Sequence, residues 1–172
     1  FYGCKQFTNI TIPVNVSSLS QGVFEACTNL TSITFAENSE LTSIDSYAFQ
    51  NCESLTSITL PAKVTIINVY NTFQGCKSLK CIDVDKNSET YSSIDGVLYN
   101  KSGTELLLFP SGSDITSYEF PNSVQSIGQY AFYYNTGLTS VDILTEVTSI
   151  PANTFAYCFN LKSVNIPNSV QS

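Results

Sequence analysis

The six cysteines are the residues of this chain best suited to chemistry. A thiol at a recurring position could form disulfides, hold zinc or act as a nucleophile. A catalytic dyad and a zinc site are disfavoured, because the chain has no His and its cysteines, Cys76 and Cys81 apart, are not grouped in C-x2–4-C pairs. Five cysteines occupy one position, three residues after a phenylalanine: Cys4, Cys27, Cys52, Cys76 and Cys158.

The phenylalanines that precede these cysteines recur with a period in the twenties. From Phe1 to Phe73 they are 23 to 25 residues apart, and Phe155 follows Phe132 by 23. A fixed period of this size indicates a solenoid built from stacked turns. The 59 residues between Phe73 and Phe132 exceed one such period by 36, which predicts an insertion in that turn.

Each repeat also contains a short alternating segment, such as Leu55 to Pro61. Ile58 and Leu60 alternate with Ser57 and Thr59, which predicts a half-buried strand that the proline ends. Stacking these segments predicts a parallel sheet. A second apolar pair follows, as in Leu41/Ile44, Val64/Ile67, Val124/Ile127 and Val147/Ile150. The rest of each turn has room for about one short helical or 3-10 segment on the opposite side.

The combined pattern AFxxCxxLxxIxIPxSVxxIG resembles the BspA-like class of leucine-rich repeat proteins. The resemblance covers essentially residues 1–172, and it implies a leucine-rich repeat solenoid, mostly β, with short parallel strands on its concave face. It also implies a cell-surface or secreted, adhesin-like protein from a bacterium or protist. The chain begins and ends within repeats, so we expect a segment of a longer array, with weak end-to-end self-association through its open ends.

An insertion at about residues 85–112 is similar to a hairpin that is common in that family. On its own pattern it predicts one arm from Val97 to Tyr99, a turn from Asn100 to Gly103 and a second arm from Glu105 to Phe109. We expect the second arm to join the main sheet as an extra strand. We expect the hairpin to project from the array, so that its tip contributes little stability.

Stacking places the first four repeat cysteines in a column. Neighbouring strands lie about 4.8 Å apart, a separation that disulfides tolerate. Equivalent side chains point inward in parallel, however, which favours free, buried, structural thiols. Asn135 replaces Cys at the equivalent position of a later repeat. Cys81 falls on an outward strand position, so we expect it to be the reactive thiol.

The composition excludes several classes of function. The net charge is −7, all seven basic residues are Lys, and Ser and Thr number 42 of 172. A nucleic-acid partner would need a basic surface, and no apolar run is long enough to span a membrane. The segment from Asp83 to Glu89 resembles the start of a calcium loop but lacks its Gly and its closing Glu. A solvated loop fits better, and no metal or other cofactor is expected.

We therefore expect a non-catalytic module that binds a protein, such as a host cell-surface or extracellular matrix protein, on its concave face. The alternative is a spacer or stalk whose parent protein binds elsewhere; an enzyme is disfavoured because no acid, base and nucleophile can be assembled. Four glycosylation sequons occur, at Asn9, Asn15, Asn29 and Asn100, which is about the number expected by chance. The expected binding residues are Asn9, Thr11, Ser32, Thr34, Ser57, Thr59, Cys81, Asp83, Ser117, Glu119, Ser140, Asp142, Ser163 and Asn165.

Overall fold

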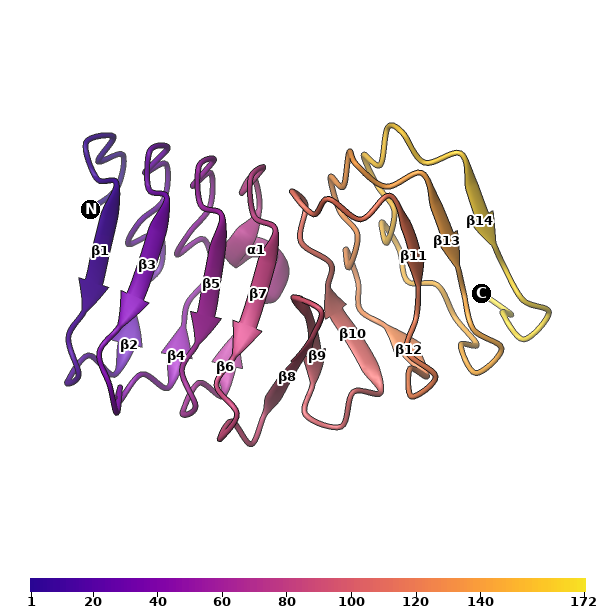
Figure 1. Cartoon of the computed structure of the whole chain (residues 1–172), viewed down its shortest axis with the longest axis horizontal. Coiled ribbons are helices and arrows are strands. Elements are labelled where there is room, and N and C mark those ends of the chain that lie inside the picture. Colours follow the sequence, from indigo (N-terminus) through magenta and orange to yellow (C-terminus); the bar gives the residue numbers. More distant parts are fainter.

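Short parallel strands line one side of the array and form its main sheets (Figure 1). The computed structural model describes residues 1–172. The first main sheet, which defines the first half of the molecule, contains β1 (Asn9–Ile12), β3 (Ser32–Phe35), β5 (Ser57–Leu60) and β7 (Cys81–Val84). The second main sheet, in the second half, contains β11 (Ser117–Glu119), β13 (Ser140–Asp142) and β14 (Ser163–Asn165).

Strand register repeats from turn to turn. Ser117 lies opposite Ser140, and Ser140 lies opposite Ser163. The alternation expected from the sequence is confirmed in β5, where Ile58 and Leu60 are buried while Ser57 and Thr59 are exposed. The main sheets therefore present one apolar face to the core and one polar face to solvent.

A second row of short strands follows the main-sheet strands β1, β3, β5 and β11. Its members in the first half are β2 (Ser18–Leu19), β4 (Ser43–Ile44) and β6 (Ile66–Ile67), which pair in parallel. Leu19 and Ile44 are buried in the same core as the main-sheet strands. The predicted second apolar pair is thus a second, shorter sheet that closes the turn on another side.

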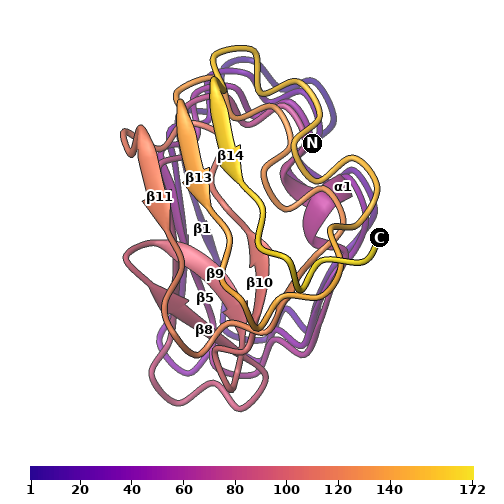
Figure 2. The ribbon, with the colours of Figure 1, turned by 90° about the vertical axis from the view of Figure 1, so that its right-hand side faces the viewer.

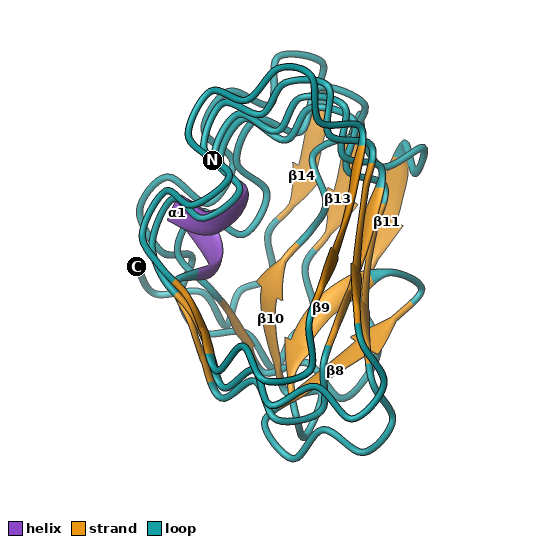
Figure 3. Cartoon of the chain, turned by 90° about the vertical axis from the view of Figure 1, so that its left-hand side faces the viewer, coloured by secondary structure: helices purple, strands orange, loops and turns teal.

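Only one turn contains the expected helical segment. Helix α1 (Val69–Phe73) lies on the side opposite to the main sheets (Figures 2 and 3). Its turn has one residue more between the second-row strand and the phenylalanine than the others have, and the side chain of Asn68 caps it by accepting from the Asn71 N–H. The other turns instead pass through a left-handed residue, as at Tyr47 and Tyr130, which cannot continue a helix.

The repeat phenylalanines stack along the interior in two runs. In the first half, the ring centroids of successive phenylalanines are 5.6, 5.7 and 5.9 Å apart. In the second half, Phe132 lies 5.1 Å from both Phe109 and Phe155. Phe109, from the insertion, therefore supplies the phenylalanine that the 59-residue interval lacked. The buried residues form one cluster for each half.

The insertion forms a sheet of its own between the halves. In spatial order it contains β12 (Ser126–Ile127), β10 (Glu105–Leu108), β9 (Val97–Asn100) and β8 (Tyr91–Ile94). The β9–β10 hairpin is confirmed, but the expectation that its second arm joins the main sheet is wrong. β10 pairs with β9 on one edge and with the second-row strand β12 on the other, so no free edge remains for a main-sheet strand.

The hairpin is buried rather than projecting. Leu98 belongs to the core cluster of the first half, whereas Val97 and Tyr99, its neighbours on β9, belong to that of the second. The tip is also held, because Ser123 Oγ donates to the Gly103 carbonyl at 2.9 Å. The expectation of a projecting hairpin is therefore corrected, because alternate side chains of β9 join the two cores. The small contribution of the tip to stability stays a prediction.

Candidate binding surfaces

The outward side chains of the main-sheet strands form a polar surface, which we call the main-sheet face. Of the residues expected to bind, Cys81 and Ser140 are partly covered. In the first half this face is almost entirely neutral, while Glu119 and Asp142 add charge in the second. The fully exposed members are Asn9, Thr11, Ser32, Thr34, Ser57, Thr59, Asp83, Ser117, Glu119, Asp142, Ser163 and Asn165.

Hydroxyl groups on this face bond to one another across strands. The hydroxyl oxygens of Thr11 and Thr34 lie 2.9 Å apart, and Ser140 Oγ donates to Ser117 Oγ at 2.7 Å. Such pairs hold side chains in one orientation while leaving acceptor capacity toward solvent. The face is therefore an ordered array of hydroxyl groups.

Other hydroxyls have a purely structural role. In several turns the threonine before the main-sheet strand reaches back to the preceding turn: Thr31 Oγ1 donates to the Thr8 carbonyl at 2.7 Å, and Thr139 Oγ1 donates to the Thr116 carbonyl at the same distance. These contacts supplement the backbone ladder between turns. Part of the high Ser and Thr content is thus explained by stacking alone.

The β8–β9 turn of the insertion divides the main-sheet face into two shorter surfaces. The turn between β8 and β9 lies on the side of the main sheets (Figures 2 and 3), and the Gly96 carbonyl accepts the Ile82 N–H at 2.9 Å. Ile94, beside this turn, is 36% exposed. A partner that spans both halves would have to accommodate the β8–β9 turn.

The same turn covers Cys81. A Cβ atom at Gly96 would lie 2.9 Å from Cys81 Sγ, so only glycine allows this approach. Burial, and then the hydrogen bond with Asp83, raises the pKa of the Cys81 thiol to about 11. Since the thiolate is the reactive form, this cover favours a slower thiol than the outward strand position predicts, and labelling of Cys81 tests the difference. The sequence could not show that a later hairpin lies over this strand.

The column of repeat cysteines donates weak hydrogen bonds from turn to turn. Each Sγ donates to the carbonyl of the repeat phenylalanine in the preceding turn, at 3.1 Å for Cys27, Cys52 and Cys76 and at 3.0 Å for Cys158. All six thiols are free. Cys27, Cys52 and Cys76 are buried, whereas Cys4 and Cys158 are only half-buried, because the turns at the two ends have a neighbour on one side only.

Burial keeps these thiols protonated. It raises the pKa of Cys52 to about 12, and that of Cys76 well above its ordinary value. Asn135 fills the same position with a stronger donor: its Nδ2 donates to the Pro110 carbonyl at 2.9 Å, and its Oδ1 accepts the Leu138 N–H at 3.0 Å. The position therefore requires a buried donor.

The four sequon asparagines have different surroundings. Asn9 and Asn15 are exposed. The Asn29 amide donates to the Lys5 carbonyl at 2.8 Å, and the Asn100 side chain accepts the Thr104 and Glu105 N–H groups at 2.9 and 3.1 Å. A glycan on Asn100 would interfere with the turn that joins β9 to β10, whereas Asn9, Asn15 and Asn29 are all exposed.

The carboxylates do not assemble an acid–base site. The Asp85 carboxylate accepts the Asn87 N–H at 2.8 Å, which caps a turn. Three other carboxylates pair with lysines: Glu40 with Lys63, Glu53 with Lys77 and Asp114 with Lys80, at 2.7 to 2.8 Å. These pairs are exposed. The arrangement stabilises the surface and positions no nucleophile.

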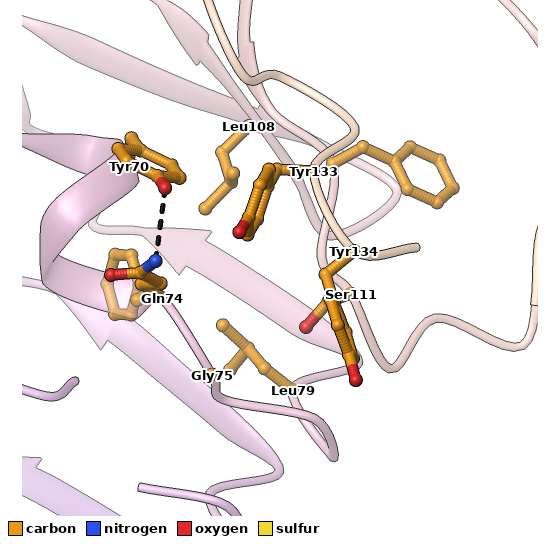
Figure 4. Close-up of a pocket in the computed structure, with 10 residues that line it drawn as sticks. Tyr70, Gln74, Gly75, Leu79, Leu108, Ser111, Tyr133 and Tyr134 are labelled. Carbon is orange, nitrogen blue, oxygen red and sulfur yellow. Dashed lines mark hydrogen bonds between the residues drawn. The ribbon is translucent and has the colours of Figure 1, made fainter. Parts of the chain in front are cut away.

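An aromatic cluster on the side opposite to the main sheets was not expected from the sequence. It begins where α1 meets the turns of the second half: the rings of Tyr70 and Tyr130 stack with centroids 3.9 Å apart, and Tyr133 meets Tyr70 edge-on at 5.0 Å. Figure 4 shows Tyr70, Tyr133 and Tyr134 around one pocket. We call the whole set the aromatic ridge: Tyr70, Tyr130, Tyr133, Tyr134, Tyr157 and Phe159.

Several members of the ridge have an unusual backbone. Tyr134 and Tyr157 have φ of +58° and +62°, the left-handed region, at the repeat position where Gly3, Ala26, Asn51 and Gly75 are also left-handed in the first half. This conformation costs a residue with a side chain roughly 1–2 kcal/mol. The runs Tyr133-Tyr134 and Tyr157-Cys-Phe159 stand where the other repeats, Tyr2 apart, have small or polar residues.

No helix in the structure is long and apolar enough to span a membrane.

Comparisons with solved structures identify the same architecture. The pneumococcal vaccine antigen PcpA matches with a TM-score of 0.87 and 30% identity over 95% of this chain and 40% of that one. A leucine-rich cell surface protein of Faecalibacterium prausnitzii matches with a TM-score of 0.62 and 29% identity, over 97% of this chain and 55% of that one.

A leucine-rich repeat protein of Eubacterium ventriosum shares the fold, with a TM-score of 0.66 at 23% identity. The match covers 96% of this chain and 55% of that one. The chain thus spans about half the length, or less, of these relatives. No curated protein matches the sequence.

The family described as the BspA type leucine-rich repeat region matches residues 1–102 and 104–172 in six copies. The solenoid, the repeated phenylalanine and cysteine positions and this match together establish that the chain belongs to the BspA-type leucine-rich repeat family.

Proposed function

We propose that this chain is a non-catalytic module that binds a protein partner through its main-sheet face, within an adhesin-like protein that is secreted or held at the cell surface. The observation that carries the proposal is the ordered row of exposed polar side chains on the parallel strands. Solenoids use such extended surfaces to bind macromolecules. The surface setting is supported by the relative from F. prausnitzii, which is described as a cell surface protein.

The two halves of the face favour different contacts. The Ser and Thr side chains of β3 and β5 suit hydrogen bonds with a partner's backbone or polar side chains. Glu119 and Asp142 in the second half are exposed carboxylates and suit a basic region of the same partner. The β8–β9 turn between the halves, with the partly exposed Ile94, offers an apolar contact at the centre of the face.

The alternative is a spacer whose polar face only keeps the sheet hydrated. A screen of immobilised extracellular matrix and host cell-surface proteins against the 172-residue chain separates the two functions. The variants Thr59→Lys and Asp142→Lys place a long charged side chain on each half of the face, and Ser126→Lys is a matched control, because Ser126 is exposed on the second-row strand β12. Binding that both face variants weaken and the control preserves supports the proposal.

Absence of any saturable binding would favour the spacer. Binding that all three variants leave unchanged would show that the partner does not use the main-sheet face, and would contradict the proposal. Antibody labelling of intact cells that carry the parent protein tests the surface location separately. Labelling only after the cells are permeabilised would contradict it.

A further inference from the structure

The aromatic ridge borders a hollow whose polar groups are mostly amides. The hollow has a volume of about 300 Å³ and lies where the turns of the first half meet Tyr133 and Tyr134. Gln50, Asn51 and Gln74 contribute their side chains to it. An amide both donates and accepts hydrogen bonds. The site therefore combines aromatic rings with groups that match a hydroxyl-bearing ligand.

Part of this amide set is held in place within the protein. Gln50 Nε2 donates to Gln74 Oε1, and Gln74 Nε2 donates to Tyr70 Oη at 3.0 Å, as Figure 4 shows for the second bond. The Asn51 side chain is exposed and has no partner in the protein. A Cβ at Gly75 would lie 2.2 Å from Asn51 Oδ1, so the glycine makes room for the amide in this position.

The hollow is electrically neutral. Its one charged residue is Lys77, whose Nζ is paired with Glu53 Oε1 at 2.8 Å. An anionic ligand would require unpaired Lys or Arg, and a cationic ligand would require carboxylates. Burial, and then the hydrogen bond with Tyr133, raises the pKa of Tyr70 to about 12, so its hydroxyl is neutral over the physiological range.

The rings of the ridge are accessible and are held at a cost in backbone strain. Tyr157 is 53% exposed and Phe159 is 69% exposed. Tyr134 and Tyr157 keep the left-handed conformation that Ala26 and Asn51 also have at this repeat position. The backbone is therefore a feature of the repeat, and the aromatic side chains are what distinguish these two turns.

We propose that this hollow and the aromatic ridge bind a neutral oligosaccharide. The apolar C–H face of a pyranose ring would rest on the tyrosine rings, while its hydroxyl groups would exchange hydrogen bonds with Asn51 and Gln50. None of the residues that line the hollow belongs to the main-sheet face, so this site is distinct from the protein-binding surface proposed above.

A glycan array probed with the 172-residue chain tests the proposal, followed by titration of a neutral oligosaccharide from the array. The chain has no Trp, and half of its ten tyrosines belong to the ridge, so a change in tyrosine fluorescence that Tyr134→Gly reduces reports binding at the ridge. The variant Tyr134→Gly removes one ring and relieves a strained backbone. We expect it to melt no lower than the wild type. We expect its dissociation constant for the oligosaccharide to rise by up to about tenfold.

Two further variants separate binding from folding. Asn51→Ala removes an exposed amide and should weaken binding without a change in melting temperature. Tyr47→Gly is the matched control, since Tyr47 has a φ of +64° but lies in the first half away from the ridge; it should leave binding unchanged. The face variant Thr59→Lys should also leave it unchanged, which distinguishes this site from the main-sheet face.

Several outcomes would overturn the proposal. They are an array without a neutral-glycan signal, equal binding by the wild type, Tyr134→Gly and Asn51→Ala, and loss of binding in Tyr47→Gly. A preference for acidic glycans that high salt abolishes would also overturn it, because the hollow has no unpaired positive charge.

Discussion

The two halves of the molecule share their interior positions and differ on their surfaces. Both stack phenylalanines about one strand apart, and both place a buried donor against the preceding turn, a thiol at Cys52 and an amide at Asn135. Outside, the first half has a main-sheet face with Asp83 as its one carboxylate, whereas the second half has Glu119, Asp142 and most of the aromatic ridge. The comparison teaches that stacking constrains the inward positions, while the outward positions are free to acquire function.

The first prediction, with the largest expected effect, concerns the buried side chains of β9 that connect the two halves. Leu98 is fully buried on β9, and its truncation to Ala should lower the free energy of unfolding by about 2–5 kcal/mol, as in other cores. Leu107→Ala, at a partly buried position on β10, is the matched control and should cost less. Urea denaturation measures both. Equal, small losses would show that the hairpin is peripheral after all.

The second prediction compares the buried donors. Asn135→Ala leaves the Pro110 carbonyl and the Leu138 N–H without their partners, and each unsatisfied buried group costs about 1–3 kcal/mol. Cys52→Ala loses one weak S–H donor and a small buried volume, so it should cost less than Asn135→Ala. Asn135→Cys should lie between them. If thermal melts rank Cys52→Ala as the more damaging change, the two donors are not equivalent.

The third prediction concerns pH and the thiols of the first half. The pKa of Cys52 rises from 9.0 to about 12 on folding. Above pH 9 the unfolded chain therefore loses this proton while the folded chain keeps it, so this contribution to stability is present below about pH 9 and falls as the pH rises toward 12. Cys52→Ala should flatten that decline in unfolding free energy. An unchanged slope in the variant would show that other groups cause the decline.

The same burial predicts slow labelling. At pH 8, Cys52, Cys76 and Cys81 should all react slowly with a thiol reagent in the folded protein, and quickly in urea, because thiolate and access are both required. Mass spectrometry identifies the sites. Rapid native labelling of Cys81 would contradict the cover that Gly96 provides.

The smallest expected effect concerns an ion pair between turns of the first half. Lys63 Nζ lies 2.7 Å from Glu40, but both side chains are about half exposed. Exposed pairs contribute about 0–1 kcal/mol, so Lys63→Ala should change the melting temperature little. A large loss of stability would mean that surface pairs, rather than the interior stack, hold neighbouring turns together.

Much of the fold could be predicted from the sequence, because stacked turns repeat their inward residues. The Phe and Cys period, the alternation in Ser57–Leu60 and the proline after it were sufficient for the solenoid and its strands. The partner of β10 was not predictable, since Leu106 and Leu108 face different cores and a pattern does not specify which edge a strand joins. The cover over Cys81 was not predictable for a related reason: it comes from the Gly96 turn, which lies outside the main-sheet repeat.

The candidate sites were predicted only in part. The outward residues of the main-sheet face follow from strand alternation. The aromatic ridge depends on contacts between Tyr70 and residues some sixty positions later in the chain, and on a left-handed backbone that normally favours glycine. Turn positions vary in every repeat, so the tyrosines resembled ordinary variation until their rings were placed together.

The inserted β9–β10 hairpin is the buried connection that holds the two halves in one array, although their surfaces differ. Hydrogen exchange of the 172-residue chain, read by mass spectrometry, tests it most directly. Amides of Val97–Asn100 and Glu105–Leu108 should be among the slowest to exchange, together with those of β5 and β7, because buried ladders open only in the larger unfolding events. Rapid exchange across the hairpin, with both halves still protected, would contradict the claim.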